Sequence, residues 1–351
     1  MEFLVLNQLF ETIFIVDQYE SILWVDRYYE PGEFEIYTPV TDDILKNVVA
    51  DNYLFFRESN KLMIVEDTTI ETNVEDGNHI KIVGRSLESL LDRRCILSTV
   101  NATGSLQATV KSLITNNIIS PTNSDRKIPN FIFEESADQR VIDLTYEGQF
   151  KGETLLDVIV DICKSKDCGF KVVLNKDNTF VFSLYMGADR SYNQEANDWV
   201  IFKPTFDNII SSNYKENHSE SKTYCYIHGE YSVSGSQREE LREVGEGTGL
   251  SRREHYIDSS ISKEDSMSLD VWRAKLDEDG KASLSEKKVK TEFEGECETS
   301  RMFKYDKDFF LGDVCQVANE YGKEAPSRVT EYMWSVSESG VENYPTFTAI
   351  K

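Results

Sequence analysis

No stretch of this 351-residue sequence approaches the roughly 18 consecutive apolar residues that a membrane-spanning helix requires. The N-terminal segment MEFLVLNQLFETIFIV is apolar, but Glu2, Asn7, Gln8 and Glu11 interrupt it, and it lacks the basic residues that begin a signal peptide. We therefore expect the protein to be made and folded in a cytoplasm and to have no membrane partner.

Basic residues are scarce. The chain has 38 lysine and arginine residues against 62 aspartate and glutamate residues, which gives a net charge of −24. Nucleic-acid interfaces depend on clustered cations that neutralise phosphates, so this charge argues against specific DNA binding. It permits DNA in transit, because an acidic wall would repel DNA. A role in solubility alone explains the charge equally well.

Proline, cysteine and histidine are also few, with 7, 6 and 4 residues. In contrast, 17 tyrosines, 19 phenylalanines and a hydrophobic content of 40% predict β-rich, well-packed domains. A chain of 351 residues exceeds the size at which single cores stop growing, which predicts two or more domains. The cysteines are scattered, which favours reduced, buried thiols over a disulfide framework; they are Cys95, Cys163, Cys168, Cys225, Cys297 and Cys315.

Motifs for catalysis and metal binding do not occur at the required spacings. The histidines show no His-Glu-x-x-His pattern. Cys225 and His228 lie three positions apart on a predicted strand, so they should point to opposite faces. No carboxylate pair stands out among the 62 acids as a glycosidase site, and Cys163 and Cys168 lack a second pair of zinc ligands. We therefore expect no enzymatic activity, no catalytic residue, no metal site and no organic cofactor.

Two segments imitate ligand-binding loops. Residues 245–249, GEGTG, imitate a dinucleotide-binding loop, but Leu250 follows where a glycine is needed, and the surrounding acids would repel a pyrophosphate. We interpret residues 237–253 as a long exposed loop. Residues 275–286 imitate a calcium loop, but Lys275 occupies the position of the first carboxylate ligand. We interpret this segment as two helices that meet at a turn at Gly280.

Hydrophobic periodicity divides the chain into four blocks. Residues 1–97 predict strands at 12–16, 21–28, 33–38, 53–57, 61–67 and 79–83, followed by a helix at 85–94. Residues 98–205 predict helices at 105–116 and 152–166, the second ending at Gly169, and strands at 170–175 and 179–185. Residues 206–290 predict strands at 208–214 and 222–231, and residues 291–351 predict strands at 291–303, 312–318, 327–337 and 343–350.

Four motifs occur in order along the sequence. Residues 21–39, SILWVDRYYEPGEFEIYTP, predict a β-hairpin with its turn at Pro31-Gly32. Residues 84–94, GRSLESLLDRR, predict a strand-to-helix junction, and Gly280 with Leu284 lies in the helical segment. Residues 305–314, YDKDFFLGDV, predict a turn with positive φ before a strand. Together these motifs resemble those of the siphophage tail-hub family, from which this sequence departs because Val314 follows Asp313 directly.

The resemblance implies a mainly β fold with α+β insertions, similar to the baseplate hub of contractile phages and phage-tail-like bacteriocins. Two tube-type β-barrel domains would comprise residues 1–97 and residues 206–234 with 291–351. Residues 98–205 and 235–290 would form an inserted outer α+β domain, although the acidic segment 237–253 has no counterpart in the family pattern.

The same resemblance implies a structural hub subunit of a phage tail tip or baseplate. Three chains would form a homotrimeric ring that joins a six-fold tail tube to a three-fold tip. Its partners would be the tail tube or a distal tail ring above, tip, spike or receptor-binding proteins below, and the tape-measure protein, with DNA passing through unbound. The subunit would be part of the tail of a virion or phage-like particle assembled in a bacterial cytoplasm.

A tail-tip cell-wall hydrolase or carbohydrate-binding protein is the alternative function. A lectin should expose pairs of aromatic residues on loops, whereas Trp24, Trp199, Trp272 and Trp334 lie mostly in periodic segments, where packing in the core explains them.

A hub channel should also carry acidic side chains, because these repel phosphates over about 8 Å at physiological salt. The channel-lining candidates are acids on the predicted solvent faces of barrel strands: Glu33, Glu35, Glu66, Asp67, Glu292, Glu294 and Glu296.

Overall fold

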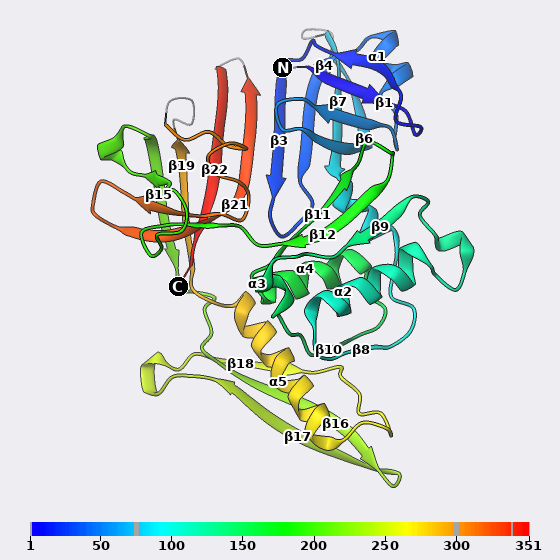
Figure 1. The fold of residues 1–351 in the computed structure, drawn as a ribbon, viewed down its shortest axis with the longest axis vertical. Helices are drawn as coiled ribbons and strands as arrows, with labels where there is room; N and C mark the ends of the chain where they lie inside the picture. The colour runs from blue at the N-terminus through cyan, green and yellow to red at the C-terminus, as the bar shows by residue number, and fades with distance from the viewer. Residues whose placement is uncertain (1, 74–76, 298–301, 338–339, 351) are drawn as a thin grey trace.

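The computed structural model describes residues 2–73, 77–297, 302–337 and 340–350, and strands dominate it (Figure 1). A large sheet lies at one end of the molecule, an α+β unit lies beneath it, and a small sheet with one long helix forms the other end. The prediction of a mainly β protein is confirmed.

The N-terminal strands follow the predicted alternation of apolar and polar residues. β3 (Ser21–Arg27) and β4 (Glu33–Pro39) form the hairpin around Pro31-Gly32, in which Trp24 lies opposite Phe34 and both are buried. The predicted helix at 85–94 is instead a short 3₁₀ helix, because the preceding strand continues to Ser86. The other elements of this part are β1 (Phe3–Leu6), β2 (Thr12–Val16), α1 (Asp42–Asn47), β5 (Tyr53–Phe56), β6 (Lys61–Asn73), β7 (Gly77–Ser86) and η1 (Leu87–Arg93).

The C-terminal strands complete the large sheet. Two short strands from the preceding region join them, because β13 (Asp189–Arg190) and β14 (Ile201–Phe202) both pair with one C-terminal strand. A short 3₁₀ helix, η4 (Pro204–Phe206), follows β14. Residues 298–301, at the end of one predicted strand, lie outside the described residues. The remaining strands are β15 (Ile209–Asn217), β19 (Lys290–Cys297), β20 (Val314–Ala318), β21 (Glu324–Ser337) and β22 (Gly340–Ala349).

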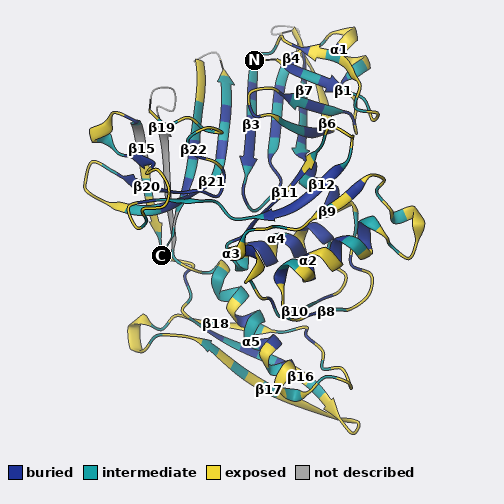
Figure 2. Ribbon diagram, viewed as in Figure 1, coloured by how far each residue is buried: buried dark blue, intermediate teal, exposed yellow. Residues whose placement is uncertain are grey.

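The two strand-rich halves form one continuous sheet of 14 strands. Its main path runs β15-β19-β22-β21-β3-β4-β7-β6-β5-β1-β2, and the halves meet where β21 pairs antiparallel with β3, with Trp334 opposite Trp24. Among the described residues this path is open at β15 and β2, so hydrogen bonding does not close either half into a barrel. A single apolar core crosses the seam and contains Phe3, Trp24, Phe202, Trp334 and Phe347. Figure 2 shows buried residues along the strands of this sheet, β3 among them.

The α+β unit has a core of its own, made of the apolar faces of its helices and strands. The predicted helices are confirmed as α2 (Leu106–Ile114), which Ser105 caps, and α4 (Leu155–Ser165), which Thr154 caps. The other elements are β8 (Val100–Ala102), η2 (Thr115–Ile119), η3 (Ser124–Arg126), β9 (Phe131–Glu134), α3 (Gln139–Ile142), β10 (Gly148–Phe150), β11 (Gly169–Leu174) and β12 (Phe180–Tyr185).

The outer unit is a three-stranded sheet covered on one face by a long helix (Figure 1). Its elements are β16 (Tyr224–Val233), β17 (Ser236–Gly245), η5 (Gly249–Ser251), β18 (Glu254–Asp258) and α5 (Leu269–Glu286). Strand β16, inside the predicted barrel segment 206–234, pairs here with β17 and β18. The unit has a small core around Cys225, Ile227, Trp272 and Leu276.

Two predictions for the outer unit are wrong. The predicted loop 237–253 is instead strand β17 (Ser236–Gly245) over its first nine residues. The charges of β17 that face α5 are matched by the ion pairs Arg242–Asp277 at 2.7 Å and Arg273–Glu240 at 2.5 Å. The predicted break at Gly280 does not occur, because α5 runs through it. A Cβ at Gly280 would lie 2.5 Å from Ile227 and 2.8 Å from Val244, so glycine permits close packing of helix on sheet.

Candidate functional site

Tyr28 stands where the N-terminal hairpin, the α+β unit and the C-terminal half meet. Its side chain is fully buried and packs against two glycines, Gly169 at the start of β11 and Gly312 before β20. A Cβ at Gly169 would lie 2.2 Å from the Tyr28 ring, and one at Gly312 would lie 2.3 Å from it. Both glycines are therefore required by contact with one aromatic ring.

Gly169 does not end α4 as predicted. The residue with positive φ after this helix is Asp167, at φ 55°, whereas Gly169 already belongs to β11. An aspartate tolerates the left-handed conformation better than most residues, so the helix ends without glycine. The glycine is needed two positions later, where the chain passes Tyr28.

A partly buried ionic network holds the same junction together. Arg328 on β21 is 5% exposed, and its guanidinium contacts the Asp167 carboxylate at 2.5 Å and donates to the carbonyl oxygen of Gly312 at 2.5 Å. The Tyr29 hydroxyl donates to the other carboxylate oxygen of Asp167. Burial raises the pKa of Tyr29, and the Asp167 carboxylate raises it further. Removal of Asp167 would leave the buried guanidinium of Arg328 without its carboxylate partner.

Asp313 accounts for the Leu-Gly-Asp part of the motif at residues 305–314, because its side chain holds the surrounding backbone in place. Its buried carboxylate accepts hydrogen bonds from the backbone N–H of Ala188 at 2.6 Å, from Arg190 Nε at 2.7 Å and from the N–H of Phe310 at 3.1 Å. Gly312 has φ +87°, which confirms the predicted turn of positive φ. The motif therefore fixes β13 beside β20 and has an architectural role.

Four of the seven channel candidates lie on the solvent side of the N-terminal half: Glu33, Glu35, Glu66 and Asp67. Three of them pair with cations on neighbouring strands at 2.5–2.7 Å: Arg27–Glu33, Lys81–Glu35 and Arg85–Glu66. Each of these three acids therefore has a cation partner, which counting acids along the sequence did not reveal, although Arg27 also pairs with Glu331 and Arg85 with Asp92. Whether this face lines a channel remains a prediction.

The other three candidates, Glu292, Glu294 and Glu296, occupy alternate positions on β19, and their side chains lie outside what the structure describes. In backbone register, Glu294 of β19 pairs with Asn213 of β15. Strand β19 therefore lies next to β15, which is the strand at one edge of the large sheet.

An acidic cleft of about 340 Å³ lies between α4 and the outer unit. Asp161 on α4 and Glu286 on α5 line it, and burial together with the Glu286 charge raises the pKa of Asp161 to about 6. Burial also raises the pKa of Asp279, although the Ser259 hydroxyl donates to it at 2.5 Å. The calcium-like segment 275–286 includes Asp279 and Glu286, but nothing in the sequence connects them with Asp161, which comes from α4, far away in the chain. The cleft suits a cationic ligand better than a phosphate.

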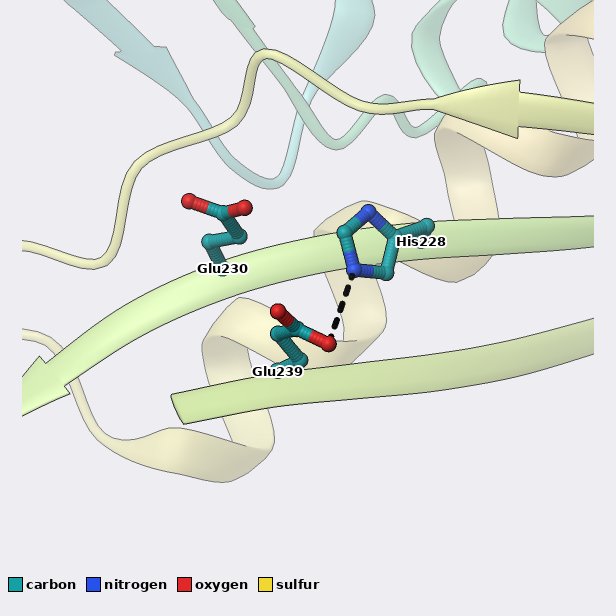
Figure 3. Close-up of side chains that lie close together, drawn as sticks. All are labelled: His228, Glu230 and Glu239. Atoms are coloured by element: carbon teal, nitrogen blue, oxygen red, sulfur yellow. Dashed lines mark ion pairs between the residues drawn. The ribbon is translucent and has the colours of Figure 1, made fainter. Parts of the chain in front are cut away.

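His228, Glu230 and Glu239 converge on the exposed face of the β16–β17 hairpin, with their ligand atoms within 4.8 Å of one another (Figure 3). His228 Nε2 lies 3.8 Å from a Glu239 oxygen. The predicted opposite orientations of Cys225 and His228 are confirmed, since Cys225 is fully buried under α5. The sequence did not reveal either glutamate as a candidate ligand. For Glu230 a signal was available, because His228 and Glu230 alternate on a predicted strand. For Glu239 there was none, because its strand was interpreted as a loop.

One expectation about aromatic residues is wrong. Trp24, Trp272 and Trp334 are buried, but Trp199 is 49% exposed on the segment between β13 and β14. Its ring contacts the exposed Tyr192 edge-to-face, with centroids 5.4 Å apart, and its Nε1 donates to the Gln194 carbonyl at 2.9 Å. The chain therefore displays an ordered pair of aromatic side chains on a loop.

The remaining motifs do not form ligand sites of the imitated kinds. The GEGTG segment joins the end of β17 to η5, and the calcium-like segment is helical within α5. Cys95, Cys163, Cys168 and Cys225 carry free thiols, as predicted, and only Cys95 among these four is exposed. In the part of the chain that the structure describes, no helix combines the length and apolarity needed to span a membrane.

Comparison with known proteins gives consistent matches over nearly the whole chain. The family model described as Siphovirus ReqiPepy6 Gp37-like protein matches residues 2–347, and no curated protein matches. Among solved structures, the 43 kDa tail protein of prophage MuSo2 from Shewanella oneidensis is similar at 12% identity and TM-score 0.60, covering 99% of this chain and 98% of that one.

Two further tail proteins share the fold. A tail protein from Neisseria meningitidis MC58 has 12% identity and TM-score 0.58, covering 99% of this chain and 95% of that one. Prophage tail protein gp18 from Listeria monocytogenes EGD-e has 13% identity and TM-score 0.56, covering 100% and 95%. At such low identity these likenesses establish a common fold.

Proposed function

Because the chain belongs to the family of Siphovirus ReqiPepy6 Gp37-like proteins, which are siphovirus tail proteins, we propose that it is the structural hub subunit of a tail tip or baseplate. The observation that supports this most strongly is the fold, which tail proteins share over almost the full length of the chain. The resemblance noted in the sequence is thus confirmed at the level of the family.

The proposed hub consists of two tube domains, residues 1–97 and residues 206–234 without β16 but with 291–351, and of an outer domain, residues 98–205 and 235–290 together with β16. The β3–β21 ladder and the shared core support a rigid connection between the two halves. Strand β16 belongs to the outer unit by its pairing, so we place it there in the proposed division.

Three such chains would form a ring that joins the tail tube to the tip. Each chain presents two strand-rich halves, which lets three copies match six tube subunits. We propose the tail tube or distal tail ring, tip or spike proteins and the tape-measure protein as partners. The ring would assemble in the bacterial cytoplasm, and no enzymatic step is required of it.

Imaging of the assembled particle tests this arrangement. We expect a reconstruction to contain three copies of the chain in one ring, with the large sheets towards the axis and the outer units at the periphery. The isolated chain is expected to stay monomeric, since a net charge of −24 opposes self-association.

Six copies or a single copy per ring would contradict the proposal. The same reconstruction identifies the channel wall: we propose that the seven candidate acids give it net negative charge, so a neutral or basic wall with these acids on the outer rim would refute their assignment. Electron microscopy of the purified chain alone is the control for assembly.

A second candidate role, binding of cell-wall carbohydrate, is supported by the exposed Tyr192–Trp199 pair. Aromatic rings offer large contact surface at low cost in conformational entropy. Trp199→Ala should then reduce binding of the purified chain to host cell walls at least about tenfold, the equivalent of about 1.4 kcal/mol. The matched control is Tyr321→Ala, another exposed aromatic residue, at 82% exposure. Equal binding by both variants and the wild type would exclude this role.

A further inference from the structure

We propose that His228, Glu230 and Glu239 form a binding site for one divalent transition-metal ion, with Zn²⁺ as the best fit. The three side chains come from two adjacent strands of the outer sheet, and their nitrogen and oxygen atoms lie within 4.8 Å of one another (Figure 3). This inference does not depend on the proposed function, because it rests on the geometry of the hairpin alone.

Strand register brings the ligands together. His228 and Glu230 are two positions apart on β16, so they share a face. Glu230 lies directly opposite Glu239 on β17. Two like charges directly opposite each other destabilise a β-sheet, so a bound cation would offset a repulsion built into this register.

The separation of the donor atoms suits a small cation. Zinc lies about 2.0–2.2 Å from nitrogen and oxygen ligands, so neighbouring donors in a tetrahedral site are about 3.4 Å apart. His228 Nε2 and the nearer Glu239 oxygen are 3.8 Å apart. A shift of a few tenths of an ångström would bring this pair to the spacing of a zinc site. The Glu230 oxygen lies within 4.8 Å of the other two donors, so this exposed side chain would have to move by up to about 1.4 Å.

The imidazole is held in the orientation that a metal ligand needs. His228 Nδ1 lies 3.0 Å from the carboxylate of Asp258, which pairs with His228 in the register of β18. A carboxylate at Nδ1 fixes the proton there and leaves Nε2 free to bind a cation, an arrangement common around metal-bound histidines. Gln237 Nε2 donates to a Glu230 oxygen at 3.1 Å, which orients a second ligand.

The donor set selects the class of metal. Calcium and magnesium prefer sites made of oxygen alone, whereas imidazole favours zinc and other transition metals. Three protein donors leave a fourth position for water or for a side chain of a partner. A bound ion would link β16 directly to β17 and, through Asp258, to β18, so it would stiffen the exposed face of the outer unit.

Calorimetric titration of the chelator-treated, full-length chain with Zn²⁺ tests the site. We expect one ion to bind per chain, with affinity falling at least about tenfold in His228→Ala and in Glu239→Gln. Asp258→Asn should weaken binding by about tenfold through loss of positioning, while leaving the stoichiometry unchanged. Co²⁺ bound to the wild type should give the visible absorption of a site with nitrogen ligation, and His228→Ala should lose it.

His218→Ala is the matched control. His218 also contacts a glutamate, Glu216 at 2.5 Å, but it lies outside the cluster, so its removal should leave Zn²⁺ binding unchanged. The proposal is overturned if the wild type shows no saturable binding, if His228→Ala binds Zn²⁺ as tightly as the wild type, or if Mg²⁺ and Ca²⁺ bind as tightly as Zn²⁺. Far-UV circular dichroism of each variant separates loss of the site from loss of the fold.

Discussion

Gly312→Ala is expected to destabilise the chain by about 2–5 kcal/mol, measured as the loss of free energy of unfolding in urea. The left-handed backbone at φ +87° costs a residue with a Cβ about 1–2 kcal/mol. The new methyl group would also lie 2.3 Å from the buried ring of Tyr28, and such overpacking costs about 1–3 kcal/mol. Because Gly312 accepts a hydrogen bond from Arg328, the displacement would also disturb the ionic network of the junction.

Two other glycines separate these contributions. Gly104 has φ +91° with no atom within 4 Å of its Cβ position, so Gly104→Ala should show the backbone cost alone. Gly169 does not have a positive φ, but a Cβ there would lie 2.2 Å from the Tyr28 ring, so Gly169→Ala should show the packing cost alone. In a Tyr28→Ala background, Gly312→Ala should cost less than in the wild type. Equal costs at Gly104 and Gly312 would mean that the Tyr28 contact contributes nothing.

Asp26→Asn is expected to stabilise the chain at pH 7.5 by up to about 3 kcal/mol and to have almost no effect near pH 4. Asp26 lies on β3 at the seam between the two halves and is 1% exposed. Burial raises its pKa to about 6, although the ammonium group of Lys61 on β6, 2.9 Å away, lowers it in part. The charges of Asp306 and Glu88 raise this pKa further.

The sign follows from proton binding. An unfolded aspartate has a pKa of about 3.9, so between pH 4 and 6 the folded state binds more protons at Asp26 than the unfolded state. The contribution of Asp26 to stability is therefore fully present below about pH 4 and is lost as pH rises through 6. Asparagine resembles the protonated form at every pH, so the variant should keep that contribution.

Urea unfolding of both proteins from pH 4 to 8 provides the measurement. The difference between their stabilities should grow with pH and level off above pH 7. Asp67→Asn, on the exposed part of β6, is the control and should change stability little at any pH. Parallel profiles for wild type and Asp26→Asn would show that Asp26 titrates alike in the folded and unfolded chain.

Local sequence was sufficient to predict the N-terminal strands except β1 (Phe3–Leu6), and two helices. In the hairpin around Pro31-Gly32, apolar residues alternate with polar ones, so each strand has one face that must be buried. Helices α2 and α4 begin next to a serine and a threonine that cap them. Within these segments the local preferences and the tertiary structure agree.

Local sequence was misleading where a second element determines the outcome. The residues of β17 are charged on both faces, so no apolar periodicity marks the strand, and its inward charges are acceptable because Arg273 and Asp277 on α5 neutralise them. Gly280 looks like a helix breaker, yet it stays helical because the glycine lets α5 pack closely against Ile227. Along the sequence, α5 is distant from β17, and Ile227 is distant from Gly280, so local patterns cannot reveal these contacts.

The amino-acid sequence by itself determined that this protein is mainly β, acidic and related to siphovirus tail proteins, because alternation, composition and short motifs are properties of neighbouring residues. Only the tertiary structure decided that the two strand-rich halves share one sheet, that predicted channel acids are paired with cations, and that His228, Glu230 and Glu239 meet. Those features depend on strand register and on contacts between distant segments. Pairing across strands therefore sets both the charge of a face and the composition of a site, and neither can be read along the chain.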